Sequence, residues 1–160
     1  MKSQESDSFS GKDTATIRKA TVNDAPRLAE LSAVLGYPVE VNVMTRRLAR
    51  LLARPEHLIL VAEATANLVV GWIHAGEQDI LEVGRFGEIL GLVVGADHRD
   101  QGIGRRLVEE VEHWARERGL DRVSVRSNIV RTESHPFYKR AGYARQKTQH
   151  TYGKYLRRDL

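Results

Sequence analysis

The stretch from Glu88 to Gly119 constrains the fold most, because it reads as a buried strand, a glycine-containing turn and a long helix in direct succession. Residues 88–94 form a short apolar run rich in β-branched side chains and bounded by glycines, and such a run is too short for a core helix. From Ile103 onwards, apolar side chains recur at helical spacing until Gly119. The turn therefore brings its glycines to the N-terminus of a helix.

The first turn of such a helix is suited to hold an anion. Its N–H groups have no partner within the helix, and the positive end of the helix dipole lies there. Gly102 and Gly104 lack a Cβ, so the backbone could approach a pyrophosphate closely. Arginine side chains in and beside the turn add positive charge and bidentate donors, namely Arg99, Arg105 and Arg106.

Two common phosphate-binding motifs fit this turn poorly. A Walker-type loop needs a Gly-Lys-Ser/Thr ending, and a dinucleotide fingerprint needs a third glycine where the chain has Leu107. The string Arg99-x-x-Gly102-x-Gly104 after an apolar strand instead resembles the acyl-CoA-binding motif of the GNAT family of N-acetyltransferases. Ser127-Asn128 and the run at 137–143 resemble that family's later motif, and the resemblance covers roughly residues 14–157.

The family resemblance implies an α/β (α+β) fold with a mixed, strongly twisted sheet of six to seven strands flanked by helices. We expect residues 14–160 to form a single domain and residues 1–13 to be a disordered tail. The local patterns predict a first strand at 14–20, helices at 23–36, 40–53 and 134–141, strands at 57–64, 67–75 and 122–127, a turn at 65–66, a polar loop at 78–85 and a terminal hairpin of 143–146 with 149–156. The strand at 122–127 is expected to run parallel to the strand at 88–94.

Composition excludes several function classes. The chain has no cysteine, which removes disulfides, thiolate metal sites and a cysteine nucleophile. No apolar run is long enough for a membrane span and no signal-peptide pattern opens the chain, so we expect a cytoplasmic protein. The net charge of +4 favours anionic partners, but no nucleic-acid-binding motif accompanies it. The six histidines lack metal-ligand spacing, and no metal is expected.

Acetyl transfer from a thioester to an amine sets three chemical demands: a base for the amine, donors for the oxyanion and an acid for the departing thiolate. The resemblance implies that Glu88 is the base, directly or through a water, although a surface role at the strand end is equally open. It also implies that pantetheine lies along the backbone of Leu92–Val94, that Asn128 contacts the pantetheine arm, and that the Tyr138 hydroxyl protonates the thiolate. Gly91 is a candidate for a bulge that helps the strands to splay.

The residues expected to bind the cofactor are therefore Leu92, Val93, Val94, Arg99, Asp100, Gln101, Gly102, Ile103, Gly104, Arg105 and Asn128. Two of them depart from the usual family pattern, which has glycine or a basic residue at position 100 and often a basic residue at position 101. An acidic group at Asp100 weakens the binding of a pyrophosphate unless the side chain turns to solvent.

These observations predict an N-acetyltransferase that transfers the acetyl group of acetyl-CoA directly to a primary amine, with a small molecule as the expected acceptor. The resemblance implies that the residues that select the acceptor lie in the helices at 23–53 and in the loops around 78–85 and 146–150. Three alternatives stay open at this point: acetylation of protein N-termini or lysines, a non-catalytic acyl-CoA-binding regulatory domain, and a nucleic-acid-binding module. Dimerisation through the terminal strands is also consistent with the sequence.

Overall fold

The computed structural model describes residues 15–157, so the predicted tail at residues 1–13 lies outside the described part of the chain. The described residues divide into two compact units, one ending at Arg126 and one beginning at Ser127, and each is described by itself. The single domain expected over residues 14–160 stays a prediction.

The first unit is built on a five-stranded sheet in the order β1-β2-β3-β4-β5. The strands are β1 (Thr16–Lys19), β2 (His57–Ala64), β3 (Leu68–Ile80), β4 (Gly84–Val94) and β5 (Val123–Val125). The pairs from β1 to β4 are antiparallel, whereas β4 and β5 are parallel. The parallel crossover predicted after the long helix is thereby confirmed.

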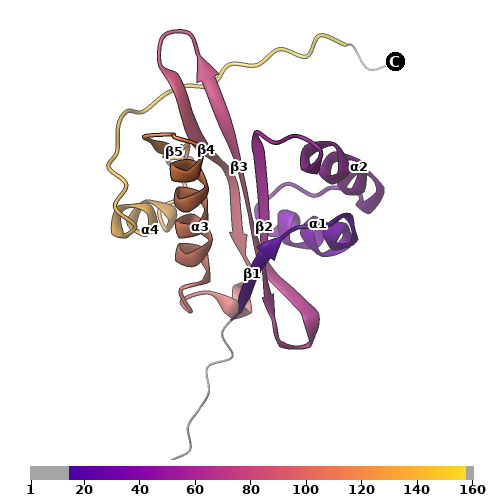
Figure 1. Ribbon diagram of the computed structural model, residues 1–160. Helices are drawn as coiled ribbons and strands as arrows, with labels where there is room; N and C mark the ends of the chain where they lie inside the picture. The colour runs from indigo at the N-terminus through magenta and orange to yellow at the C-terminus, as the bar shows by residue number, and fades with distance from the viewer. Residues whose placement is uncertain (1–14, 158–160) are drawn as a thin grey trace, which may run out of the picture. The chain divides into compact units, whose positions relative to one another are not determined.

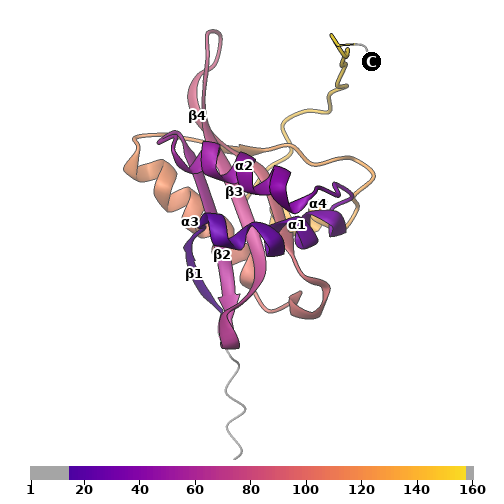
Figure 2. The same cartoon turned by 90° about the vertical axis from the view of Figure 1, so that its right-hand side faces the viewer.

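Helices cover both faces of this sheet (Figures 1 and 2). Helices α1 (Ala25–Val34) and α2 (Val41–Leu52) lie on one face, and α3 (Ile103–Glu117) lies on the other. Short 3₁₀ turns η1 (Val22–Asp24), η2 (Thr65–Asn67) and η3 (Ala96–His98) complete the unit, and η2 forms the turn predicted between β2 and β3. The helices expected at 23–36 and 40–53 are confirmed, apart from shifts of one or two residues at their ends.

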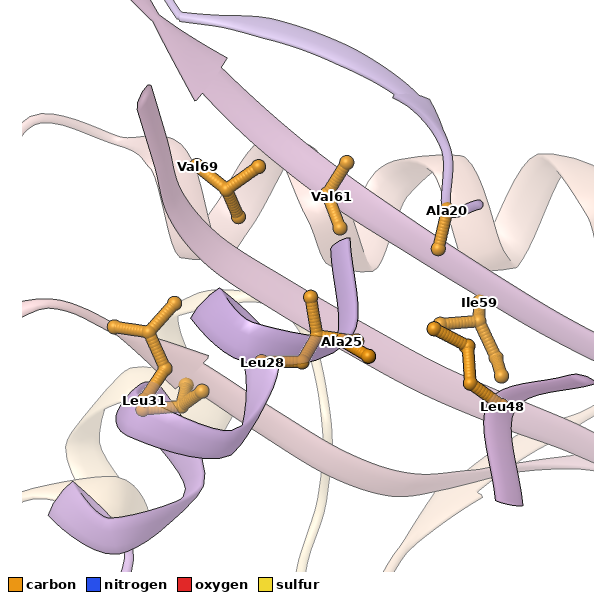
Figure 3. Packing of buried hydrophobic residues seen from close by; sticks show 9 residues of the cluster. Ala20, Ala25, Leu28, Leu31, Leu48, Ile59, Val61 and Val69 are labelled. Atoms are coloured by element: carbon orange, nitrogen blue, oxygen red, sulfur yellow. The ribbon is translucent and has the colours of Figure 1, made fainter. Parts of the chain in front are cut away.

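The core on the α1–α2 face joins side chains from both helices to the sheet (Figure 3). Leu28 and Leu31 of α1 and Leu48 of α2 are buried against Ile59 and Val61 of β2. On the opposite face, α3 buries the residues that gave it helical spacing in the sequence, among them Leu107, Val111 and Ala115. Helices therefore pack on both faces of the sheet, and β4 lies between α3 on one face and α1 and α2 on the other.

The expected six to seven strands are wrong, because the described residues contain five. The missing strands are those of the terminal hairpin, since residues 143–157 form no strand. An isolated two-stranded hairpin is marginal in water unless one face is buried, and Tyr152, Tyr155 and Leu156 are almost fully exposed.

The polar loop expected at 78–85 is also wrong, because β3 continues to Ile80 and β4 begins at Gly84. The strands pair as far as Ile80 opposite Gly84, and only residues 81–83 form the turn. Arg85 donates to Glu77 across the strands at 2.6 Å, and Arg118 contacts the other oxygen of Glu77 at 2.8 Å. Cross-strand ion pairs of this kind support a polar hairpin that alternation of apolar residues alone does not reveal.

The second unit contains α4 (Ser134–Arg140), which agrees with the helix predicted at 134–141. The ring of Tyr138 contacts Phe137 and Tyr143 edge-on, with centroid distances of 5.0 and 5.9 Å. In the part of the chain that the structure describes, no helix combines the length and the apolar character needed to cross a bilayer.

Candidate functional site

A β-bulge interrupts β4 in its middle. The register with β3 shifts between His74 and Ala75, so that Gly91 faces His74 while Ile89 faces Ala75, and Leu90 is the extra residue. The pairing with β5 extends only from Gly87 to Ile89. Beyond the bulge, β4 therefore runs on without a second neighbouring strand among the described residues.

The free edge of β4 offers backbone groups for hydrogen bonding. Just past the strand, the N–H of Gly95 donates to Val70 on the β3 side at 2.8 Å. The direction of the backbone hydrogen-bonding groups alternates along an antiparallel strand. The N–H and C=O of Val93 therefore point towards β3, whereas those of Leu92 and Val94 point to the open edge. An extended ligand could pair with this edge as an added strand would.

A close approach at the bulge requires glycine. A Cβ at Gly91 would lie 2.8 Å from the ring edge of Trp72, a distance that real Cβ atoms do not reach. The bulge predicted at Gly91 thus lies beside it, at Leu90, and Gly91 allows the indole of Trp72 to lie across β4.

The turn that follows β4 carries the predicted glycines to the N-terminus of α3. Gly102 is the N-cap residue and adopts a left-handed conformation with φ of 78°. Its carbonyl accepts the N–H of Arg106 at 3.1 Å, while a Cβ at Gly102 would meet no atom within 4 Å. The space beside Gly102 is therefore open at the N-terminus of α3, where the N–H groups of the first turn lack partners within the helix.

The three arginines near this turn have different surroundings. Arg99 Nε lies 3.4 Å from the carbonyl of Val94, and Arg105 Nε lies 3.2 Å from Glu109; both arginines are exposed. Arg106 instead donates to the carbonyl of Ala15 at 2.6 Å. Arg99 and Arg105 place exposed positive charge near the turn, whereas Arg106 ties α3 to the backbone of Ala15.

Asp100 stands in the same turn with φ of 61°, a conformation that glycine and asparagine adopt more readily than aspartate. We expect Asp100→Asn to strengthen acetyl-CoA binding about threefold, because it removes one negative charge beside the anion site and keeps the backbone conformation. Isothermal titration at low and high salt measures the change, which should shrink at high salt. Asp121→Asn, at an exposed residue outside the turn, should leave the affinity unchanged.

Glu88 is a buried carboxylate on β4, with 5% of its surface exposed. One carboxylate oxygen lies 3.1 Å from Nε of Arg126, whose side chain is largely exposed. Glu88 lies opposite Gly76 in the ladder between β3 and β4. A Cβ on Gly76 would lie 3.4 Å from the ring of His57, so Glu88 and His57 lie on the same face of the sheet. The carboxylate therefore lies on the α1–α2 face of the sheet, on the same strand as the free edge.

Two histidines form a hydrogen-bonded pair on this face. Nδ1 of His57 and Nε2 of His74 are 2.9 Å apart. Burial and, to a smaller extent, the neighbouring His57 together lower the pKa of His74 to about 4. The pKa of His57 is also lowered by burial and by the charge of Arg54. The pair is therefore neutral at pH 7.

This pair makes stability depend on pH. Because the pKa of His74 is lower in the folded chain than in the unfolded one, the unfolded state binds more protons between about pH 6.5 and pH 4. We expect the free energy of unfolding to fall by about 2 kcal/mol as the pH drops through this window, a value reduced for the partial exposure of the ring. Chemical denaturation across the window measures it. His74→Gln should flatten the curve and His150→Gln, at an exposed residue, should not.

Two predicted site residues lie in the second unit. Asn128 organises the segment before α4, because its side-chain oxygen accepts the N–H of Val130 at 3.1 Å and its carbonyl accepts the N–H of Arg131 at 3.0 Å. Burial raises the pKa of Tyr138 to about 12, so its hydroxyl stays protonated throughout the physiological range.

Sequence reasoning brought together Glu88, the Leu92–Val94 backbone and the turn at 99–105, which the structure places along one strand and the helix start that follows it. It did not identify the Arg126 contact of Glu88, or the pairing of His57 with His74. The turn at 65–67 alone would not have found the histidine pair, because a register shift between Ala62 and Glu63 decides that His57 and His74 lie on the same face.

Comparisons with known proteins agree with this geometry. The model of the acetyltransferase (GNAT) family matches residues 26–143. An IAA acetyltransferase of Azospirillum brasilense is 31% identical over 131 residues, which cover 79% of this chain and 82% of the relative. Glucosamine 6-phosphate N-acetyltransferase 1 of Oryza sativa subsp. japonica is 33% identical over 97 residues, which cover 59% of this chain and 57% of the relative.

Solved structures share the fold. An aminoglycoside antibiotic 6'-N-acetyltransferase from Acinetobacter baumannii superposes with a TM-score of 0.79 at 17% identity, over 89% of this chain and 99% of that one. An aminoglycoside N-acetyltransferase solved in complex with CoA gives the same TM-score at 16% identity, over 88% of this chain and 94% of that one.

Proposed function

Because this chain belongs to the GNAT family of acetyltransferases, we propose that it transfers the acetyl group of acetyl-CoA directly to a primary amine on a small molecule. One observation carries the proposal: beyond its short pairing with β5, the free edge of β4 leads straight into the glycine-containing turn at the N-terminus of α3. A thioester whose arm pairs with that edge delivers its pyrophosphate to the helix start. The CoA complex of a structural neighbour and the activities named for the relatives support the same assignment.

We propose that the cofactor is held by backbone more than by side chains. The edge groups of Leu92 and Val94 bind the pantetheine arm, and the N–H groups from Gly102 to Gly104 bind the pyrophosphate. Arg99 and Arg105 supply charge at the turn. Asp100 and Gln101 shape the turn, Ile103 anchors it through its buried side chain, and Asn128 contacts the pantetheine arm in the family pattern.

In the reaction, the neutral amine attacks the thioester carbonyl, the C–N bond forms, and the C–S bond breaks to release coenzyme A as a thiol. An alkylammonium has a pKa near 10, so a base must remove its proton at neutral pH. Glu88 is the residue we propose for this step, directly or through a water. The N–H groups of the free β4 edge stabilise the oxyanion. No acyl-enzyme is needed.

Tyr138 is proposed to protonate the departing thiolate, and its raised pKa keeps the hydroxyl in the donating form. We expect Tyr138→Phe to lower kcat about tenfold with little change in KM, a modest factor because a thiolate is already a good leaving group. Steady-state thiol release measures the effect. Tyr152→Phe, at an exposed residue, should match the wild type; equal activity of Tyr138→Phe would remove the acid role.

The proposed function is tested by incubating the protein with acetyl-CoA and a panel of primary amines. Thiol release is followed with a colorimetric reagent and the acetylated amine is identified by mass spectrometry. The proposal requires one mole of N-acetyl product for each mole of thiol. Thiol release without acetylated amine, or acetylation restricted to peptide N-termini and lysines, would contradict it.

A further inference from the structure

A cavity of about 250 Å³ lies between α1, α2 and the sheet. Its wall is mainly apolar, with Leu28 and Leu35 from α1 and its C-cap, Met44, Leu48 and Leu51 from α2, and Ile59 and Leu90 from the sheet. Figure 3 shows the helix side of this region, where Leu48 lies beside Ile59. The indole of Trp72 contributes an aromatic wall, held across β4 by Gly91. A cavity of this size and lining suits a small ligand with a flat apolar body.

The charges around the cavity have one sign. No Asp or Glu is among its lining residues, and its charged side chain is Arg47 of α2. The side chain of Arg47 is exposed, and its guanidinium has neither a hydrogen bond nor an ion pair within residues 15–157. Two other polar side chains of the lining already have partners. The Ser32 hydroxyl donates to the carbonyl of Leu28 at 2.7 Å, and the His74 ring is hydrogen-bonded to that of His57. A polycation would find no carboxylate here, whereas an anionic group would find Arg47.

The cavity is linked to the proposed base along the sheet. His74 lines the cavity, and Gly76, which pairs with Glu88, is two residues farther along β3. At about 3.3 Å per residue, this places the backbone of Glu88 roughly 7 Å beyond that of His74, on the same face. An amine that approaches Glu88 can therefore keep the rest of its molecule in the cavity.

Resting on the proposed function, we infer that the acceptor is a small primary amine with a flat apolar body and an acidic group that binds Arg47. The apolar body occupies the space beside Trp72, the amine points along β4 towards Glu88, and the carboxylate or phosphonate pairs with the guanidinium. Polyamines and other multiply charged cations fit the cavity less well, because its lining offers them no carboxylate and places the positive charge of Arg47 beside them.

Binding of three amines to the Trp114→Phe variant tests this inference. The remaining Trp72 lies in the cavity wall, so its fluorescence reports binding without any reaction. The probes are 4-(aminomethyl)benzoate, benzylamine, which lacks the acid, and spermidine. We expect the benzoate to bind about fivefold more tightly than benzylamine, and spermidine to bind most weakly.

Two further variants test whether Arg47 causes the preference for the benzoate. Arg47→Gln should abolish the preference for the benzoate over benzylamine, and Arg46→Gln, on the same helix but outside the lining, should keep it. A preference that survives Arg47→Gln, tighter binding of spermidine, or no binding of any probe at millimolar concentration would overturn the inference. Acetyl-CoA is titrated separately into the same proteins, so a failure of the proposed function is seen independently of the amine result.

Discussion

Replacing Glu88 with Gln is expected to lower kcat by about 100-fold to 1,000-fold near pH 7, because the amine would then lose its proton without a positioned base. Acetyl-CoA affinity should change by less than about twofold, since Glu88 lies before the bulge and outside the edge that we propose as the cofactor site. The loss should also shrink as the pH approaches the amine pKa of about 10, where the acceptor is increasingly neutral in solution. Steady-state rates between pH 7 and pH 10 measure both effects.

Two controls separate a catalytic role of Glu88 from a structural one. Arg126→Gln breaks the 3.1 Å contact to Glu88 but leaves the carboxylate, so a base role predicts a much smaller loss than that of Glu88→Gln. Glu110→Gln, at an exposed residue of α3, should have no effect. Equal losses in Glu88→Gln and Arg126→Gln would assign Glu88 to a structural ion pair instead, and full activity of Glu88→Gln would leave water as the base.

Replacing Gly102 with Asp is expected to weaken acetyl-CoA binding about 100-fold. The new carboxylate would stand at the start of α3, where it would repel the pyrophosphate and occupy its N–H donors. The matched substitution is Gly102→Asn, which has nearly the same shape and tolerates the φ of 78°. We expect Gly102→Asn to bind acetyl-CoA within about tenfold of the wild type.

This pair of variants isolates charge from backbone strain. Both side chains enter space where a Cβ meets no atom within 4 Å, and both carry the strain of a side chain at φ of 78°, so the two variants should be destabilised to a similar extent. Thermal unfolding checks that expectation, and the KM for acetyl-CoA together with its dissociation constant measures binding. Equal binding by the two variants would show that the turn does not hold the pyrophosphate.

The elements that sequence predicted well are those with a strong local signal. The strand at 88–94 and the helix from Ile103 were evident because a β-branched apolar run meets a helical repeat at a glycine turn. The parallel pairing of β5 with β4 could be predicted because a helix that connects two strands of one sheet lets the second strand run in the same direction as the first. The anion site at this turn stays a prediction, which rests on the N–H groups that any helix N-terminus offers without tertiary contacts.

The features that sequence missed depend on contacts between distant residues. The extension of β3 and β4 as far as Ile80 and Gly84 rests on ion pairs of Glu77 with Arg85 and Arg118, which no apolar alternation reveals. The bulge shifts the register by one residue, and only the paired strands define where it lies. The terminal hairpin was expected from short stretches of residues, but nearly all of them are exposed, so burial does not stabilise it.

The cavity belongs to the same class of unpredicted feature. Its lining comes from α1, α2, the loop between them and three strands, and no pattern in the sequence shows that these elements surround one space. Trp72 reads from sequence as one more apolar strand residue. Its role emerges only because Gly91, on the neighbouring strand, leaves room for its ring.

Isothermal titration of acetyl-CoA into the wild-type protein tests the central claim most directly, because it requires no knowledge of the acceptor. We expect saturable binding of one acetyl-CoA per chain with a micromolar dissociation constant, and competition by coenzyme A, which keeps the pyrophosphate and pantetheine. The absence of binding, or binding that coenzyme A does not displace, would contradict the assignment of the β4 edge and the α3 turn as the cofactor site.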